Sequence, residues 1–330
     1  MADWTWTTAS PMTQQLWAGR FWIEAKTESY FYSNGFIGPS EVNDIIVEMP
    51  DLMEKQGSQI TFGQLRELSG AGIQGDATLE GNEEAPNTYD DLITIDQWRN
   101  AIRTKGKLSE QYPSDKAVRK WAMELLKRWM AEKIDQDLFD AIGLSPTKVI
   151  YAGSATTTAT VAAGEYFTLS LISKCVAYGK KATPKIQGKM IKGKKTPGVI
   201  VIHVDQEYDL TERDASWAQA QREAMARGND NPIFTGALGV HKNVPIHSHE
   251  RVAIATNWGA AANVAGATAL YMGVASGAIA YVKKKIWNEK TFDYGNKVGF
   301  AIGALYGVTK AVFNSSDNAV VAVRSARTSN

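Results

Sequence analysis

The chain has 330 residues, of which 44% are hydrophobic and 22% charged, and its formal net charge is +1. These values are typical of a folded chain with one or two domains, and they exclude a disordered or fibrous protein. The single cysteine, Cys175, lies in an apolar stretch and has no internal disulfide partner. A disulfide-stapled secreted scaffold is therefore excluded, and a buried, unreactive thiol in a reducing compartment is expected.

Charge is divided unevenly along the chain. Residues 1–150 contain 23 acidic and 15 basic side chains, whereas residues 151–330 contain 12 and 21. An acidic run without Lys or Arg comprises Asp76, Glu80, Glu83, Glu84, Asp90, Asp91 and Asp96. A lysine run without acids comprises Lys180, Lys181, Lys185, Lys189, Lys192, Lys194 and Lys195. Opposite potentials of this kind can register copies of one chain head to tail. Taken alone, each run is at least as typical of a solvated loop as of a contact between copies.

The first third of the chain favours extended structure. Residues 1–50 carry scattered aromatic side chains without a sustained period, which predicts a terminal arm that lies against its own chain or a neighbour. Residues 57–90 are rich in glycine and acid, which predicts a long, loosely held loop. The apolar residues that follow, from Leu92 through Trp98 to Ile102, predict a strand.

A long helix is expected over residues 115–142, with Ser114 as N-cap and Gly143 at its far end. One apolar stripe is expected to face the core, composed of Val118, Trp121, Ala122, Leu125, Trp129, Ile134, Leu138 and Ile142. Twenty-eight residues at ~1.5 Å each give a helix of roughly 42 Å, long enough to form the backbone of the molecule.

The remaining pattern mixes helices and strands. We expect a helix over residues 165–178, a buried strand over 199–202, and a second helix that opens at a capping box, residues 211–214, and ends before Gly228. Short strands are expected from residue 233 onward and over 319–323. The fold class is therefore α+β.

No pattern in the sequence supports catalysis or a cofactor. Residues 70–75 spell G-x-G-x-x-G, but the acidic, Pro-containing segment that follows would repel a phosphate and is unsuited to the required helix. His247 and His249 share a strand face as half of a metal site, yet no further ligands complete it, and ordinary histidines are the stronger interpretation. We expect no catalytic, cofactor-binding or metal-binding residue.

Two segments of the sequence permit a binding role. The lysine run at 180–195 permits non-specific phosphate contact but lacks interleaved aromatics that stack bases. Residues 252–282 contain no charged side chain, which suggests a membrane span, but Ala, Gly, Thr, Ser and Asn dominate them and make transfer into lipid weak. Close-packed strands or interface segments fit this stretch better.

Five motifs in order resemble the N4-type family of tailed-phage major capsid proteins. They are Leu79-Glu80-Gly81-Asn82-Glu83-Glu84, then Tyr89-Asp90-Asp91 with the strand 92–95, Tyr208-Asp209-Leu210 with Trp217, residues 231–239, and Phe292-Asp293-Tyr294-Gly295. The resemblance runs from about residue 60 to the C-terminus and implies the HK97-like capsid fold.

In those terms the resemblance divides the chain into four parts. It implies an N-terminal arm at 1–55, an extended loop (E-loop) at 56–113, and a peripheral (P) domain at 114–145 and 291–314 with the spine helix at 115–142. Residues 146–290 and 315–330 would form the axial (A) domain.

The implied function is a non-enzymatic shell subunit that self-assembles into hexamers and pentamers of an icosahedral virion capsid enclosing double-stranded DNA. It would be made in the bacterial host cytoplasm, with portal, scaffolding or decoration proteins as further partners and no membrane. A non-specific nucleic-acid-binding oligomer is the alternative. The inter-subunit interface is expected to use the two charge runs, with Ile93 and Trp98 as apolar anchors: Asp76, Glu80, Glu83, Glu84, Asp90, Asp91, Lys180, Lys181, Lys185, Lys189, Lys192, Lys194 and Lys195.

Overall fold

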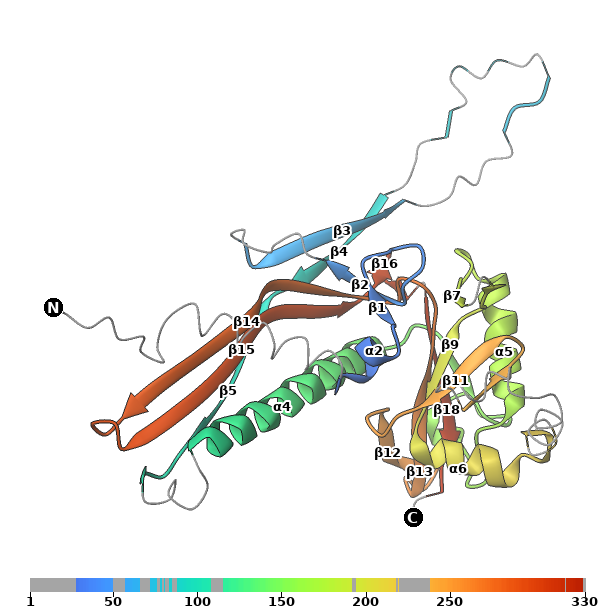
Figure 1. Cartoon of the computed structure of the whole chain (residues 1–330). Helices are drawn as coiled ribbons and strands as arrows, with labels where there is room; N and C mark the ends of the chain where they lie inside the picture. Colours follow the sequence, from blue (N-terminus) through green and yellow to red (C-terminus); the bar gives the residue numbers. More distant parts are fainter. Residues whose placement is uncertain are drawn as a thin grey trace.

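The computed structural model describes residues 28–49, 57–65, 72–75, 78, 80, 83–84, 88–107, 115–191, 194–217, 219, 238–317 and 319–328. Two bodies lie side by side: an elongated one with a long helix under a sheet, and a compact one around a second sheet (Figure 1). A two-stranded hairpin projects from the elongated body. The structure therefore combines helices and sheets, as expected for the α+β class.

The elongated body contains a five-stranded sheet in the order β1-β2-β14-β15-β5. Its strands are β1 (Ile37–Gly38), β2 (Ile46–Met49), β14 (Gly277–Phe292), β15 (Lys297–Lys310) and β5 (Asp96–Arg103). β14 and β15 form one long antiparallel hairpin, paired from Gly277 with Lys310 to Phe292 with Lys297. The hairpin supplies most of the length of this body and positions its distal tip far from the compact body (Figure 1).

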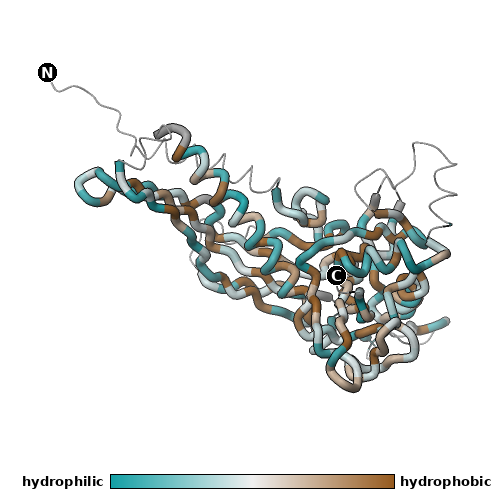
Figure 2. Tube along the Cα trace, turned by 90° about the horizontal axis from the view of Figure 1, so that it is seen from below, coloured by the Kyte–Doolittle hydropathy of each residue, from teal (hydrophilic) through white to brown (hydrophobic). Residues whose placement is uncertain are grey.

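Helix α4 (Asp115–Gly143) lies along this sheet and packs against β15. Hydrophilic and hydrophobic residues alternate along it (Figure 2), as they do in a helix with one face in the core. The long helix is confirmed, but its stripe was placed wrongly at two positions. Trp121 and Leu125 are 54% and 59% exposed, because Ala122, Leu126 and Met130 occupy the face that contacts the sheet.

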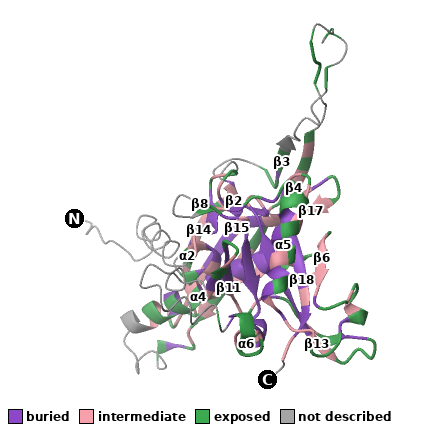
Figure 3. Ribbon diagram, turned by 90° about the vertical axis from the view of Figure 1, so that its right-hand side faces the viewer, coloured by how far each residue is buried: buried purple, intermediate pink, exposed green. Residues whose placement is uncertain are grey.

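The compact body contains a seven-stranded sheet with the path β10-β11-β9-β13-β18-β6 and with β12 paired to β13. Its strands are β10 (Gly239–His241), β11 (Val244–Ser248), β9 (Val199–Ile202), β13 (Val264–Met272), β18 (Val320–Ala326), β6 (Val149–Tyr151) and β12 (Ile254–Trp258). Burial is concentrated in these central strands (Figure 3). The expected strands at 199–202 and 319–323 are therefore confirmed.

Helices α5 (Leu169–Lys181) and α6 (Val204–Arg213) cover one face of the seven-stranded sheet. β9 is buried on both faces: Ile200 and Ile202 join the cluster under these helices, whereas Val199 and Val201 join the cluster that contains α4. A strand that is covered on both faces is apolar at every position, which explains the four successive β-branched residues of β9.

Smaller elements complete the chain. They are α2 (Tyr30–Ser33), the 3₁₀ turn η1 (Thr158–Thr160), the projecting hairpin β3 (Gln59–Leu65) with β4 (Thr88–Thr94), and the short pairs β7 (Met190–Ile191) with β8 (Lys194–Lys195) and β16 (Val312–Phe313) with β17 (Ser316–Asp317). The residues without charge at 252–282 form β12, β13 and the start of β14. Close packing explains their composition, since a Cβ on Gly266 would overlap the Trp258 ring.

The helix expected to open at 211–214 begins slightly later than expected: residues 215–217 and 219 are helical, and Asp214 Oδ1 accepts a hydrogen bond from the Ser216 N–H. The helix before it, α6, was not predicted. It begins after His203, whose Nδ1 accepts a hydrogen bond from the Asp205 N–H, while Gln206 Oε1 accepts from the His203 N–H. This reciprocal cap uses histidine and glutamine, so a search for Ser or Thr with Glu misses it. The rest of the expected helix, from residue 220, lies outside the described residues.

Three expected domain limits also differ from the structure. Residues 30–49, expected in a terminal arm, pack in the core through Phe31, Ile45 and Ile46. β5, expected in the E-loop, pairs with β15 in the five-stranded sheet. The limit expected at residue 290 falls inside β14, which is continuous from Gly277 to Phe292.

Candidate assembly surfaces

The projecting hairpin β3–β4 is anchored only at its base. Ile60 and Ile93 are 8% and 0% exposed and pack with residues of β2 and β14. The Phe62 ring contacts the Phe313 ring edge-on, with centroids 5.6 Å apart. Asp91 fixes the base further, since its Oδ2 accepts a hydrogen bond from the Val312 N–H at 3.1 Å. The described residues of the outer part of the hairpin lie away from the rest of the molecule (Figure 3).

The acidic run is divided by this geometry. Glu80, Glu83, Glu84 and Asp90 are exposed on the projecting part, whereas Asp76 lies outside the described residues. Asp91 is half-buried and bound within its own chain. The surface available to a neighbour is therefore smaller than the sequence suggests.

The two apolar anchors expected to contact a neighbour are used inside the chain instead. Ile93 is fully buried under the five-stranded sheet, which excludes it from an inter-subunit contact. Trp98 packs against the main core, and Lys133 Nζ lies 3.7 Å from the centroid of its ring. A cation over an aromatic face stabilises this arrangement further. The apolar pattern of a strand identifies burial, but it does not say which chain provides the cover.

The lysine run is also divided. Four of its members are exposed: Lys180, Lys181, Lys185 and Lys195. Lys192 and the side chain of Lys194 lie outside the described part of the structure. Lys189 Nζ instead donates to the Gly35 carbonyl and to Asp44 Oδ1, the latter at 3.0 Å. Among the described residues, no ion pair joins the lysine run to the acidic run of the same chain.

A second cluster ties the N-terminal part of the described chain to α4 and β11. Asp135 is buried and accepts hydrogen bonds from Ser29 Oγ at 2.7 Å and from the N–H groups of Tyr30 and Phe31. Burial raises the pKa of the Asp135 carboxyl, and these hydrogen bonds together with Arg251 partly oppose that rise. The carboxylate therefore serves as an N-terminal cap for α2.

The two histidines considered as half of a metal site pack in this aromatic cluster. The His249 ring stacks on Phe139 with centroids 5.0 Å apart, and the His247 ring meets Phe36 edge-on. Burial lowers the pKa of His247 to about 4, so its ring is neutral at neutral pH. Over the described residues, no group of three or more His, Cys, Asp or Glu side chains is arranged to hold a metal ion.

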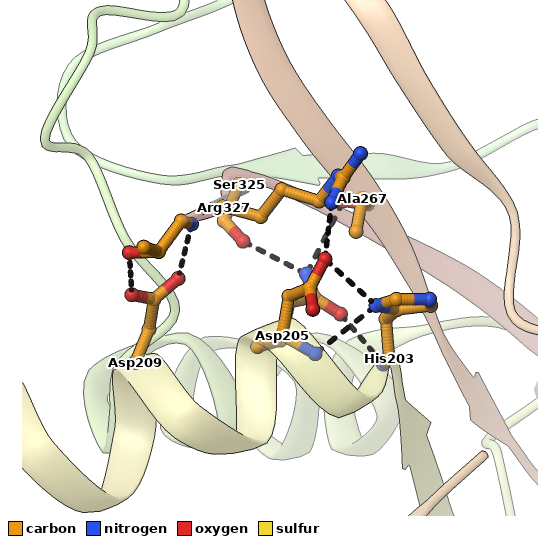
Figure 4. A network of polar contacts seen from close by, with 8 residues as sticks. His203, Asp205, Asp209, Ala267, Ser325 and Arg327 are labelled. Carbon is orange, nitrogen blue, oxygen red and sulfur yellow. Dashed lines mark hydrogen bonds and ion pairs between the residues drawn. The ribbon is translucent and has the colours of Figure 1, made fainter. Parts of the chain in front are cut away.

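The C-terminal segment is bound to α6 by a polar network (Figure 4). Asp209, which is fully buried, accepts hydrogen bonds from the Thr328 N–H at 3.0 Å and from Thr328 Oγ1 at 2.5 Å. Arg213 Nε donates to the same carboxylate at 3.1 Å. One turn earlier, Asp205 forms an ion pair with Arg327. The contacts of Thr328 and Arg327 were not visible in the sequence, because their partners on α6 are more than a hundred residues away.

A cleft of about 470 Å³ lies between the N-terminal end of α5 and the C-terminal end of α6. Its carboxylates hold the surrounding chain: Glu165 accepts from the N–H groups of Ser154 and Ala162, and Asp214 accepts from the Leu169 N–H. Arg213 lies over the Tyr166 ring at 4.2 Å. Lys174 also lines the cleft. The two carboxylates and Arg213 are therefore committed to structural contacts.

The buried thiol behaves as expected, since burial raises the pKa of Cys175 to about 12 and leaves it protonated. In the part of the chain that the structure describes, no helix combines the length and apolarity needed to cross a bilayer. The notable features are instead surfaces that project from the molecule: a hairpin, an elongated sheet and charged helices.

An elongated body, a compact body and a projecting hairpin with exposed side chains suit a subunit of a protein shell. The comparisons with known proteins agree with this class. Residues 7–166 and 144–328 match a family model described as phage capsid protein, so the chain belongs to that family.

Individual relatives point in the same direction. The chain is 27% identical to the major capsid protein of Pseudomonas phage KPP25 over 91% of its own length and 89% of the relative's. It is similar to the capsid of Ralstonia phage GP4, with a TM-score of 0.80, 26% identity and coverage of 99% of this chain and 96% of that one. A cyanophage Pam1 capsid chain shares the fold, with a TM-score of 0.78 at 18% identity, over 100% of this chain and 97% of that one.

These findings confirm the expected family, the HK97-like fold and the role of capsid protein in a tailed-phage virion. Self-association of the chain follows from that role. The narrower resemblance to the N4-type group stays a prediction.

Proposed function

We propose that the chain is a structural subunit without a reaction of its own, which forms the hexamers and pentamers of an icosahedral shell around packaged DNA. The observation that carries this proposal is the projecting hairpin, which is anchored near its base by Ile60, Phe62, Asp91 and Ile93 and carries exposed side chains along both strands. An isolated two-stranded hairpin is marginally stable in water. A neighbouring copy that covers it supplies the missing packing.

The described elements correspond to the parts of an HK97-like subunit with revised limits. In this assignment β3 and β4 are the E-loop, and α4, β5, β14 and β15 form the P domain with α4 as spine. The seven-stranded sheet with α5 and α6 forms the A domain. The chain crosses between P and A domains more than once, since β14 and β15 lie between β13 and β18 in sequence.

The proposed interface is reduced to the side chains that remain exposed. On the hairpin these are Glu80, Glu83, Glu84 and Asp90, and in the lysine run they are Lys180, Lys181, Lys185 and Lys195. We infer that the acidic hairpin lies over a neighbouring copy, where charge fixes the register of many modest contacts summed over a closed lattice. Portal, scaffolding and decoration proteins, and non-specific contact of lysines with packaged DNA, belong to the same proposal.

The test is the assembly state of the purified full-length chain. Under assembly conditions, negative-stain microscopy and sedimentation velocity are expected to show capsomers and closed shells. A small monodisperse species under the same conditions would contradict the proposal. The contribution of the hairpin is tested by Glu80→Lys with Asp90→Lys, which is expected to weaken assembly. The matched control, Glu41→Lys with Glu250→Lys, makes the same change at exposed positions off the hairpin and is expected to assemble normally.

A further inference from the structure

The outer faces of α5 and α6 carry opposite charge. On α5 the exposed stripe consists of Ser170, Lys174, Ala177 and Lys181, with Lys180 beside it. α5 contains no acidic residue, and no hydrogen bond or ion pair of the Lys174 and Lys181 ammonium groups is found among the described residues. This helix therefore presents a positive face, one lysine of which, Lys174, also lines the cleft with Glu165 and Asp214.

The outer face of α6 is acidic with an apolar centre. Asp205 and Asp209 are neutralised within the chain by Arg327 and Arg213. Glu207 and Glu212 have no such partner among the described residues. On the same face Val204 and Tyr208 are each 46% exposed, one helical turn apart. A large aromatic ring flanked by two carboxylates is typical of the anchor of a protein contact rather than of a solvated helix.

The two faces are complementary in charge and in side-chain size. Lys174 and Lys181 lie about 10.5 Å apart along the axis of α5, with the small side chain of Ala177 between them. Glu207 and Glu212 are five residues apart, so they lie on opposite sides of the exposed face of α6, with Tyr208 between them. Long lysine side chains can reach past the ring to both carboxylates. A ring from one helix can therefore lie on the alanine of the other while lysines meet carboxylates on both sides.

We propose that α5 of one copy packs against α6 of a second copy, with Tyr208 on Ala177 and with Lys174 and Lys181 opposite Glu207 and Glu212. The proposal rests on the shell-forming function and names one contact of that shell. The partner is a second copy because the complementary face is present on this chain itself, and because a capsid subunit is surrounded by identical copies. Both faces belong to the compact body, so this contact is separate from that of the projecting hairpin.

The test is a charge swap in the full-length chain. Lys174→Glu with Lys181→Glu, and separately Glu207→Lys with Glu212→Lys, are each expected to raise the concentration needed for assembly about tenfold or more, because like charges then face each other across the contact. The fourfold variant restores opposite charges and is expected to regain assembly. The control, Lys105→Glu with Lys107→Glu, changes two exposed lysines away from both helices and leaves assembly unchanged.

Failure of this contact is distinguishable from failure of the shell function. If the unmodified chain assembles and both charge-reversed variants assemble equally well, or if the fourfold variant stays unassembled while its circular dichroism is native, the proposal is wrong.

A crosslink covers the case of a variant that does not fold: Ala177→Cys with Tyr208→Cys in a Cys175→Ala background. Oxidation of assembled particles is expected to produce disulfide-linked multimers, and their absence overturns the contact.

Discussion

The Nζ of Lys310 donates a hydrogen bond to Oδ2 of Asp317 at 2.9 Å, and the two side chains are only 6% and 2% exposed. The same ammonium group donates to the carbonyls of Leu144 and Ser145, directly after the last turn of α4. Asp317 also accepts from the Thr147 N–H at 2.9 Å. This buried pair therefore joins three segments where the elongated and compact bodies meet: the end of α4, the end of β15 and the β16–β17 hairpin.

Replacing Lys310 by Met is expected to destabilise the unassembled subunit by about 3–5 kcal/mol, because Asp317 then stays buried without a cation. Urea unfolding followed by tryptophan fluorescence measures the change. The double variant Lys310→Met with Asp317→Leu removes both charges and is expected to recover part of the loss. Lys105→Met, at an exposed position, is the control and should change stability by less than about 0.5 kcal/mol. If Lys310→Met and this control had equal free energies of unfolding, the Lys310–Asp317 pair would not have the stabilising role proposed for it.

The Asp135 carboxyl predicts a pH dependence of stability. Burial raises its pKa above the ordinary value of 3.8, so the folded chain holds this proton at a pH where the unfolded chain has released it. Stability from this group is therefore greatest at low pH and decreases as the pH rises from about 3.8 through the raised pKa. Urea midpoints measured across acidic pH test the sign. The Asp135→Asn variant has no group that titrates at this position. The difference in urea midpoint between the unmodified chain and this variant is therefore expected to change with pH between about 3.8 and the raised pKa, and to be constant above it.

The sequence predicted the parts of the fold whose signals are local. The length of α4 and the four apolar residues of β9 are encoded in their own periodicity and composition. The surfaces were harder to predict, because burial depends on residues that are distant in sequence. Ile93 looks like an anchor for a neighbour only until β2 and β14 cover it, and Lys189 looks like an interface lysine only until Asp44 binds it.

Which face of a helix lies in the core is equally difficult to predict when apolar residues occur all around the helix. Trp121 and Leu125 fit a 3.6-residue period as well as Leu126 and Met130 do, and the sheet contact alone decides which of them are buried. The His203 cap of α6 was missed for a different reason. Histidine is an uncommon N-cap, and the Thr211 segment is closer to the usual capping pattern although it lies at the end of the helix.

A close approach between Gly266 and Trp258 predicts a site where alanine is not tolerated. A Cβ on Gly266 would overlap the indole of Trp258, which is 7% exposed and packs against Val161 and Ala326. Gly266→Ala is expected to destabilise the subunit by about 1–3 kcal/mol, because β12 must shift away from β13. The matched control is Gly143→Ala at the end of α4, where a Cβ meets nothing within 4 Å. There alanine is expected to be neutral or slightly stabilising. Thermal unfolding of the two variants beside the unmodified chain is the measurement.

The contact between Asp209 and Thr328 predicts that the C-terminal segment holds α6 in place. Thr328→Val keeps the shape of the side chain but removes the hydroxyl donor, so one oxygen of a fully buried carboxylate loses a partner. The expected loss is about 1–3 kcal/mol, because a hydrogen bond to a charged, buried carboxylate is removed and Arg213 Nε is then the donor that remains to that oxygen. Thr328→Ser retains the hydroxyl and is expected to stay close to the unmodified chain. Hydrogen exchange localises the effect: faster exchange is expected in α6 and in β18, with no change in the β14–β15 hairpin. Uniform acceleration throughout the chain, or none in α6, would show that Thr328 is not the residue that fixes this helix.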